Sequence, residues 1–480
     1  MKSNSDPAAV FMKHIKDATK GAIPCSNGEE RLPWGSPMRN RRLLPVLTLL
    51  ALIGGLVALP SFADSQARIV RLSQVDGDVQ IDRNTGKGFE RAFLNLPITQ
   101  GMKVETGLDG RAEVEFEDGS AIRITPNTVI SFPELALRDN GGKVSTVVLQ
   151  QGTAYVNFLA NKDKSDQLTL SFGKAKLALN EAAHLRVFLG DVDASVAVFK
   201  GEIQVSGPSG DVEIGKSKTA SFDLAQNYKY EIARNLEPDP YDAWDKQQSE
   251  YHDRYATNNS GSYSPYAYGG SDLNYYGSFS NVPGYGNMWQ PYFAGAGWDP
   301  FMNGVWSYYP GFGYAWASGY PWGWTPYHYG SWIYVPAYGW GWQPGGSWAG
   351  LNQPNVNGGT YVPPKPPSSG NSTVVVNRGG SFPTTTSGFF GSRMTIGENS
   401  AGLGVPRGSI RNLGSLSLQA QQHGTATTHL PSSTIWGSGT GWGNTGSRGP
   451  GYSSPGVRST GMSTHSSGAH SSGGGHSSHR

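Results

Sequence analysis

Residues 111–124, with the sequence RAEVEFEDGSAIRI, decide the fold class of this chain. Charged and apolar residues alternate strictly from Arg111 to Glu117, and a second alternating run follows the turn residues Asp118-Gly119-Ser120. A period of two is typical of a β-strand with one buried face, and an Asp-Gly pair supplies the positive φ angles that a tight turn needs. The stretch therefore predicts a β-hairpin.

The same period of two continues on both sides of this hairpin, from about Ile69 to Arg234. Further runs of this kind are Asp78–Asp82, Ser145–Leu149, Ala154–Leu159, Gln167–Phe172, Ala194–Phe199, Glu202–Val205 and Asp211–Ile214. Many short strands at this spacing indicate an antiparallel β-sandwich or roll rather than a parallel α/β sheet. We therefore expect residues 64–235 to form a β domain, which at about 170 residues can fold without a metal or a disulfide.

Several short motifs in this region follow one another in a characteristic order. They are Val75–Val79, Ile98–Gly107, Phe116–Ile124, Pro126–Thr128, Leu149–Val156 and Val198–Val205. Through them, residues 69–225 resemble the FecR-like domain of bacterial extracytoplasmic proteins, whose founding member is a periplasmic sensor paired with a sigma factor. Ahead of its apolar segment this chain has only 42 residues, too few for the helical cytoplasmic module of such regulators. The resemblance therefore implies a fold and a compartment, not the signalling role.

Two features of the β domain invite a functional interpretation. Glu113, Glu115 and Glu117 share one strand face, which suggests either a cation site or paired acids, or simply the solvated face of a half-buried hairpin. We favour the solvated face, because oxygen-ligand sites need converging loops rather than one flat strand. His184 has no partner near it in the sequence and is interpreted as a surface or core histidine whose hydrogen bonds are satisfied.

A short helix is predicted over residues 239–256. Asp239 suits a helix cap, Pro240 the first helical position and Asp242 the acid of a capping box. One face of the helix carries large side chains at spacings of three and four, namely Tyr241, Trp244, Gln248, Tyr251 and Tyr255. We expect this amphipathic linker to dock on the β domain.

The composition then changes to an aromatic repeat module, residues 262–350. Residues 289–348 contain ten tryptophans, no lysine or arginine and a single formal charge, Asp299. The segment Gly297–Trp316 returns 26 positions later as Gly323–Trp342, and each copy predicts two short strands around a turn that contains proline. Because such hairpins cannot bury their faces alone, we expect the copies to pack against each other.

This region also resembles a Trp/Tyr/Gly-rich module of unknown function that often follows FecR-like domains. The residues that carry the resemblance are Gly270–Ser278 and Trp322–Trp332. The absence of lysine and arginine disfavours nucleic acid, because base stacking needs a cationic groove as well. Most rings are expected to pack against each other, and a glycan or cell-wall polymer is the alternative ligand. Its candidate contacts are the repeat-related residues Trp298, Trp306, Trp324 and Trp332.

The ends of the chain carry targeting and low-complexity signals. Arg39, Arg41 and Arg42 precede the apolar stretch Leu43–Leu59, and Ser61-Phe62-Ala63 suits a cleavage site, so residues 1–63 are expected to comprise an N-terminal extension and a signal peptide. Met38 is a plausible true start. The alternative is a membrane anchor, for which 17 apolar residues interrupted by Pro45 and Gly54-Gly55 are short. Residues 351–480 are rich in Gly, Ser, Thr and Pro and are expected to be a mostly disordered tail.

These observations favour an exported protein of the bacterial cell envelope that acts by interaction rather than catalysis. The single cysteine, Cys25, lies ahead of the expected cleavage site, so the mature chain would have no thiol chemistry. No catalytic, cofactor or metal constellation is evident, and the histidines of the tail have no fixed geometry. We expect a scaffold whose partner is an envelope protein or a polysaccharide. The alternatives are a membrane-anchored FecR-type transducer that controls a sigma factor, and a glycan-binding protein.

Overall fold

The computed structural model describes residues 68–138, 140–160, 166–256, 266–295, 297–309, 313–348, 374–377, 385–388 and 391–430. The chain divides into two units, Met1–Ser65 and Gln66–Arg480, and every described residue belongs to the second. The predicted extension and signal peptide therefore lie outside the described residues. None of the helices in the described ranges is long and apolar enough to cross a membrane.

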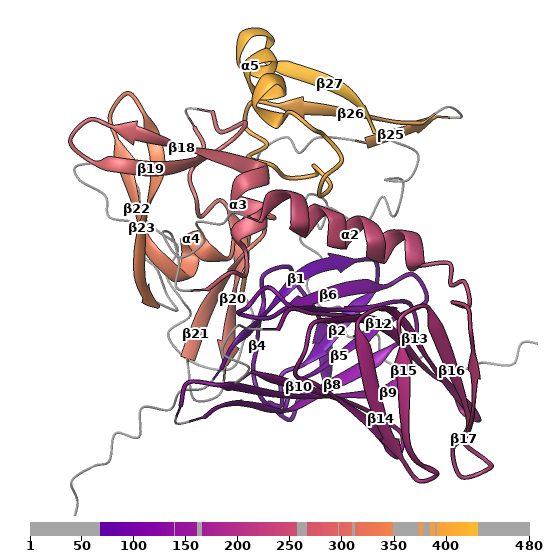
Figure 1. Ribbon diagram of the computed structural model, residues 1–480. Helices are drawn as coiled ribbons and strands as arrows, with labels where there is room; N and C mark the ends of the chain where they lie inside the picture. Colours follow the sequence, from indigo (N-terminus) through magenta and orange to yellow (C-terminus); the bar gives the residue numbers. More distant parts are fainter. Residues whose placement is uncertain are drawn as a thin grey trace, which may run out of the picture. The chain divides into compact units, whose positions relative to one another are not determined.

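Residues 70–233 form the expected β domain, with 17 strands in two packed layers (Figure 1). The strands are β1 (Val70–Asp76), β2 (Val79–Asp82), β3 (Phe89–Arg91), β4 (Pro97–Ile98), β5 (Lys103–Thr106), β6 (Arg111–Glu115), β7 (Ala121–Ile124), β8 (Val129–Leu137), β9 (Lys143–Phe158), β10 (Gln167–Phe172), β11 (Ala175–Leu179), β12 (Ala183–Leu189), β13 (Asp193–Lys200), β14 (Glu202–Gly207), β15 (Gly210–Gly215), β16 (Lys218–Asp223) and β17 (Lys229–Ala233). The hairpin predicted from residues 111–124 is β6–β7, in which Val114 pairs with Ile122. Its turn contains Gly119 at a φ of 88°.

Strand β9 corrects one detail of the prediction, because Ser145–Leu149 and Ala154–Leu159 belong to one strand of 16 residues rather than two. Its first half pairs with β8 and β10, and its second half pairs with β7 and β12, so that β9 takes part in both layers. Gly152, at a φ of 87°, lies where the strand passes from one layer to the other. The β9–β10 pair is parallel, whereas the other strand pairs in the described ranges are antiparallel.

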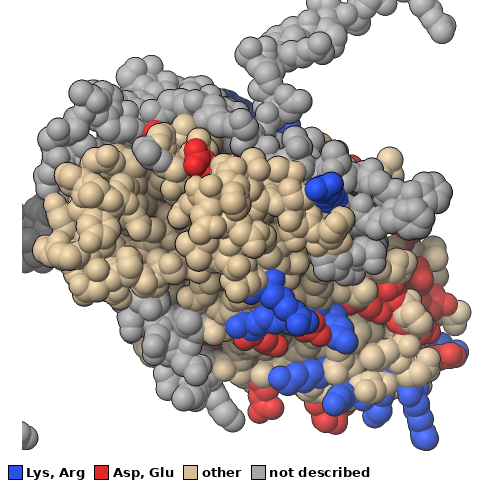
Figure 2. All heavy atoms as spheres, turned by 90° about the horizontal axis from the view of Figure 1, so that it is seen from above, with Lys and Arg blue, Asp and Glu red and all other residues tan. Residues whose placement is uncertain are grey.

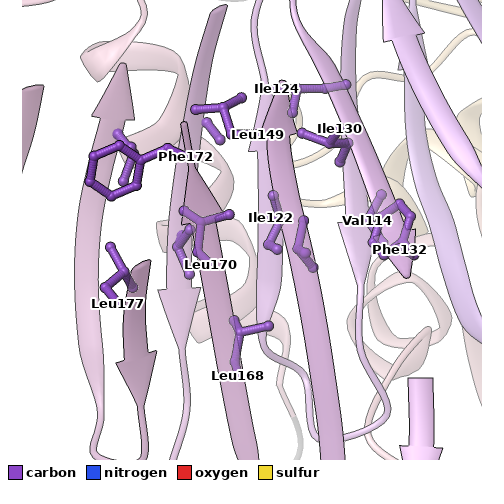
Figure 3. Packing of buried hydrophobic residues seen from close by; sticks show 14 of the residues in the cluster. Val114, Ile122, Ile124, Ile130, Phe132, Leu149, Leu168, Leu170, Phe172 and Leu177 are labelled. Carbon is purple, nitrogen blue, oxygen red and sulfur yellow. The ribbon is translucent and has the colours of Figure 1, made fainter. Parts of the chain in front are cut away.

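The core of the β domain lies between the two layers. Side chains from β6, β7, β8, β9, β10 and β11 meet there, as Figure 3 shows for Val114, Ile122, Phe132, Leu149 and Leu170. These five residues are almost completely inaccessible to solvent. The period-two pattern of the sequence places them on the inner faces, as a sandwich requires.

The expected linker helix is α2 (Asp242–Tyr255), which lies over the layer that contains β6 (Figure 1). The Asp239 side chain accepts a hydrogen bond from the Tyr241 amide, and the Asp242 carboxylate accepts one from the Asp239 amide. These bonds stabilise a turn ahead of the helix, whose N-cap is Tyr241 without a side-chain hydrogen bond, so the prediction of a capping box on Asp239 was wrong. Trp244 is buried and receives the Arg111 guanidinium over its ring at 5.3 Å.

The aromatic module contains both predicted hairpins. Its elements are α3 (Gly270–Tyr276), β18 (Gly277–Val282), β19 (Gly286–Pro291), β20 (Asn303–Tyr309), β21 (Gly313–Ser318), α4 (Thr325–His328), β22 (Tyr329–Val335) and β23 (Gly339–Trp348). The repeat is visible in the register, since Trp306 pairs with Trp316 in the first hairpin and Trp332 pairs with Trp342 in the second. The hairpins lie in different sheets, and their rings meet in one shared aromatic core.

Residues 351–480, predicted to be mostly disordered, include an ordered part. This part holds β24 (Val374–Asn377), β25 (Thr385–Gly388), β26 (Gly391–Gly397), α5 (Leu413–His423) and β27 (Thr425–Leu430). Strand β24 pairs with β20 of the aromatic module, and Met394 and Ile396 are buried in the aromatic core. The segment has too few apolar residues to fold alone, and it folds because the module covers those it has. The remainder of the predicted tail lies outside the described residues.

Candidate functional site

The strand face with Glu113, Glu115 and Glu117 is the most unusual surface in the described part of the chain. All three side chains are buried, with exposed fractions of 0%, 2% and 6%, so the prediction of a solvated face was wrong. The face is covered by α2, by α3 and by residues near position 407. Each carboxylate is paired with arginine, as a buried charge requires.

Glu113 lies at the centre of this buried charge network. Its Oε2 accepts a hydrogen bond from Arg123 Nε at 2.8 Å, and its Oε1 accepts from Arg407 Nη1 at 2.5 Å and from Ser73 Oγ at 2.6 Å. His252 Nε2 lies 3.1 and 3.2 Å from the two oxygens. Burial by itself would raise the pKa of Glu113, but the charges of His252, Arg407 and Arg123 outweigh it and hold that pKa well below its usual value.

Arg71 connects the β domain to the aromatic module. Its Nη1 lies 3.0 Å from Glu115 Oε2, and its Nη2 lies 2.6 Å from Asp272 Oδ2 of α3. The same Nη2 also donates to the Pro321 carbonyl at 2.8 Å. Burial raises the pKa of Glu115 despite the charge of Arg71.

Asp245 connects α2 to the same network. Its Oδ1 lies 2.7 Å from Arg123 Nη1, and its Oδ2 lies 2.7 Å from His184 Nε2. His184 thus has a partner 61 residues away in the sequence, as the interpretation of a satisfied histidine requires. A second contact binds α2 to the β domain, since the Tyr155 hydroxyl of β9 donates a hydrogen bond to the Asp242 carboxylate at 2.9 Å.

The network fastens three parts of the chain together. It contains three guanidinium groups, four carboxylates and two histidines: Arg71, Arg123, Arg407, Glu113, Glu115, Asp245, Asp272, His184 and His252. The hydroxyls of Ser73 and Tyr251 donate to carboxylates of the network rather than to a histidine, and both residues are buried. Such a cluster favours structural fastening over acid–base or nucleophilic chemistry, which needs access for a substrate.

The four tryptophans proposed as glycan contacts lie in the aromatic core. Trp298 is 4% exposed, Trp306 is 1% exposed, and Trp324 and Trp332 are fully buried. As folded, none of them offers a ring face to a sugar, and their burial favours the alternative in which most rings pack against each other. The reason is geometric: the hairpins turn their Trp faces toward one shared core rather than toward solvent.

Trp322 is the residue around which the other rings of the core gather. Its ring centroid lies 4.9 Å from those of Trp289 and Tyr320 and 5.8 Å from that of Trp332. Its Nε1 donates to the Ala401 carbonyl at 2.7 Å, so the core also holds the segment near position 400. Sequence reasoning named Trp322 only as part of the repeat.

The outer surface of the module carries tyrosines rather than tryptophans. Tyr338 is 50% exposed and Tyr334 is 36% exposed, both at the β22–β23 hairpin. Between residues 266 and 348 the only formal charges are Asp272, which is buried, and Asp299. Figure 2 shows a broad area without charged side chains beside one in which they are crowded.

A small pocket opens beside the Arg68–Glu117 ion pair. It is lined by Arg68, Phe116, Asp118, Ser120, Lys143, Ser145, Phe158, Asp166, Gln167 and Leu168. Burial raises the pKa of Asp118 to about 6, although Ser120 donates two hydrogen bonds to its carboxylate. No group of three or more His, Cys, Asp or Glu side chains in the described ranges is placed to hold a metal ion.

The Asp118 carboxyl makes a testable contribution to stability. Because its pKa is higher in the folded protein than in the unfolded chain, the stabilising effect of its proton is complete below about pH 4 and is lost as the pH rises through 6. Relative to Asp118→Asn, the wild type should lose about 2 kcal/mol between pH 4 and pH 7.5. Urea unfolding of both proteins at the two pH values measures this difference. Asp211→Asn, at an exposed position, is the control, and an equal loss in both variants would contradict the assignment.

Comparison with known proteins agrees with this architecture. The model of the family described as "FecR protein" matches residues 102–204, and the model of a "Family of unknown function (DUF6600)" matches residues 270–366. No curated protein matches the chain.

Two crystal structures, at 1.65 and 2.50 Å resolution, of a "putative anti-sigma factor" from Parabacteroides distasonis ATCC 8503 are also similar. The first is 16% identical with a TM-score of 0.25, and the similarity covers 30% of this chain and 63% of that one. The second is 15% identical with a TM-score of 0.26, and the similarity covers 32% and 71%. The matching part thus spans less than two thirds of the first structure's chain.

The two family matches fall on the two modules that the buried charge network joins. The first lies within the β domain, and the second begins at α3 and covers the aromatic hairpins. The chain therefore carries a FecR domain at residues 102–204 and a DUF6600 region at residues 270–366.

Proposed function

We propose that this protein is an exported, non-enzymatic interaction or scaffold protein of the cell envelope. The FecR domain match supports an extracytoplasmic role, because the FecR-like resemblance implies that compartment. The observation that carries the proposal is the buried charge network. Its ion pairs join the β domain and the aromatic module into one unit. The outer face of the aromatic module, which carries few charges, then serves as the contact surface.

Export is tested by cell fractionation and by sequencing the mature N-terminus. We expect a chain that begins near Asp64 in the periplasm or outside the cell. A full-length chain in the cytosol would contradict the proposal.

The alternative is a membrane-anchored transducer that controls a sigma factor, which the FecR match also supports. A transducer must keep residues 1–63 as a span with a working cytosolic end, whereas a scaffold can lose them. Deleting codons 1–37 and starting at Met38 should leave export and transcription unchanged if the protein is a scaffold. A changed set of transcripts would instead favour the transducer.

A glycan or cell-wall polymer remains the alternative partner, and its contacts would have to be exposed rings. Tyr334 and Tyr338 are the matched pair to test, because their hairpin tip projects two aromatic side chains. Pull-down on insoluble cell-wall polymer that is lost in Tyr338→Ala at unchanged melting temperature would support this partner. No pull-down by the unmutated protein would exclude it.

A further inference from the structure

A segment outside both family matches, residues 401–410, is held in a cleft between the β domain and the aromatic module. Three module side chains bind its main chain. Trp322 donates to the Ala401 carbonyl at 2.7 Å, and Tyr276 donates to the Val405 carbonyl at 2.6 Å. Tyr275 donates to the Pro406 carbonyl at 3.1 Å and accepts from the Ile410 amide at 3.0 Å. The segment is thus bound through its backbone, as peptides are bound in recognition clefts.

Arg407 anchors the segment at the bottom of the cleft. Its Nη1 lies 2.5 Å from Glu113 Oε1, its Nε lies 3.3 Å from Asp272 Oδ1, and another nitrogen donates to the Ser73 carbonyl. The guanidinium lies over the Tyr251 ring at 5.5 Å. With 8% of the residue exposed, this is a closed pocket made by β1, β6, α2 and α3.

The pocket suits arginine better than lysine. Two carboxylates, a carbonyl and an aromatic face surround a planar group from different directions, and only the guanidinium fork has donors for all of them together with a flat face for the ring. An ammonium has no flat face for the ring and cannot meet both carboxylates and the carbonyl in this geometry.

The neighbours of Arg407 also fit the cleft. Gly408 has a φ of 64°, and a Cβ at this position would come within 3.2 Å of Tyr251 Cδ2, so a side chain here is disfavoured twice. Leu403, Val405 and Ile410 are buried on either side of the arginine. The cleft thus fits one short sequence, in which an apolar residue and a proline precede the arginine and a glycine follows it.

We propose that this cleft is an arginine-specific peptide site, filled here by the chain's own residues 401–410, and that it accepts the same segment from a second copy of the chain when its own is absent. The site is built from residues of both modules, and the segment that fills it lies outside both family matches. This proposal does not depend on the location or the partner proposed above.

The direct test uses the full chain with the anchor removed. In Arg407→Ala the cleft lacks its own arginine, so a labelled peptide of residues 399–413 should bind it at least about a hundredfold more tightly than it binds the wild type, measured by fluorescence anisotropy. The same peptide with alanine or lysine at position 407 should bind at least about tenfold more weakly. Arg411→Ala, which removes an exposed arginine directly after the segment, is the matched control and should behave like the wild type.

Two results would overturn the proposal. Either the peptide binds Arg407→Ala no better than it binds the wild type, or the peptide without the arginine binds equally well.

A second test needs no variant in the cleft and remains valid if Arg407→Ala fails to fold. A specific protease site inserted between Gly358 and Gly359 allows the folded full chain to be cut ahead of the segment. The two pieces should elute together in size-exclusion chromatography at micromolar concentration. An excess of the 399–413 peptide should displace residues 401–410 from the cleft, which is measured as a loss of fluorescence quenching between labels on the two pieces. Separation of the pieces without peptide, or the same displacement by the alanine peptide, would overturn the proposal.

Discussion

Replacement of Trp322 by alanine is expected to lower the free energy of unfolding by about 3–5 kcal/mol, the usual effect of removing a large buried aromatic side chain. The ring is fully buried and contacts Trp289, Tyr320 and Trp332, so the space it leaves has no exposed neighbour that can fill it easily. Its indole N–H also holds the Ala401 carbonyl, which would lose that partner. Urea unfolding followed by far-UV circular dichroism measures the loss.

The matched control is Tyr338→Ala, which removes a half-exposed ring from the β22–β23 hairpin. We expect a change of no more than about 0.5 kcal/mol there. Trp324→Ala and Trp332→Ala should resemble Trp322→Ala, because both rings are fully buried. Unchanged stability in all three variants would show that these tryptophans do not form the core, and would restore Trp324 and Trp332 as candidate glycan contacts.

Replacement of Glu113 by glutamine is expected to lower the free energy of unfolding by about 3 kcal/mol, because it removes the buried negative charge that Arg123 and Arg407 share and leaves each guanidinium with one carboxylate, Asp245 or Asp272. Arg123 and Arg407 both lose their shared carboxylate, and His252 loses its nearest acceptor pair. Glutamine keeps the shape of the side chain, so the change isolates the charge. Glu213→Gln, at an exposed position on β15, is the control and should be nearly neutral.

The pH dependence of stability gives this prediction a second readout. Since the pKa of Glu113 is held well below its usual value in the folded protein, its stabilising contribution is complete above about pH 4.5 and is lost as the pH falls through the folded-state pKa. The wild type should therefore approach Glu113→Gln in stability as the solution is acidified. A constant difference between the two proteins from pH 7 to pH 3 would contradict the assignment.

The hairpins of this protein were predictable because each depends on residues that are close in the sequence. The Asp118-Gly119 turn and the alternation around it predict β6–β7, and the 26-residue repeat predicts both aromatic hairpins with their equivalent Trp pairs. Two strand predictions merged into β9, because Gly152 lets one strand change layers where glycine more often ends a strand.

The site was not predictable from the sequence. The alternating pattern shows which side chains share a strand face, but it does not show what covers that face. The sequence suggested that Glu113 and Glu115 are solvated because the residues that cover them are distant in the chain. These residues are Asp245, Asp272 and Arg407, which lie 132 to 294 residues after Glu113. The folding of residues 391–430 was missed for the same reason, since its few apolar side chains are buried by another part of the chain. A sequence signal was available in Arg407, which follows proline and precedes glycine in a stretch with few charges.

The covered face of β6 also determines how this protein can be produced in pieces. A recombinant fragment that ends with the β domain would place Glu113, Glu115, Arg71 and Arg123 in water, where such side chains are well hydrated, so it should be soluble. A fragment made of the aromatic module alone would instead lose the partner of Asp272 and uncover the rings that face the segment at 401–410, which invites aggregation. The practical boundaries for expressing the aromatic half are therefore Arg68 and Leu430, not the ends of its family match.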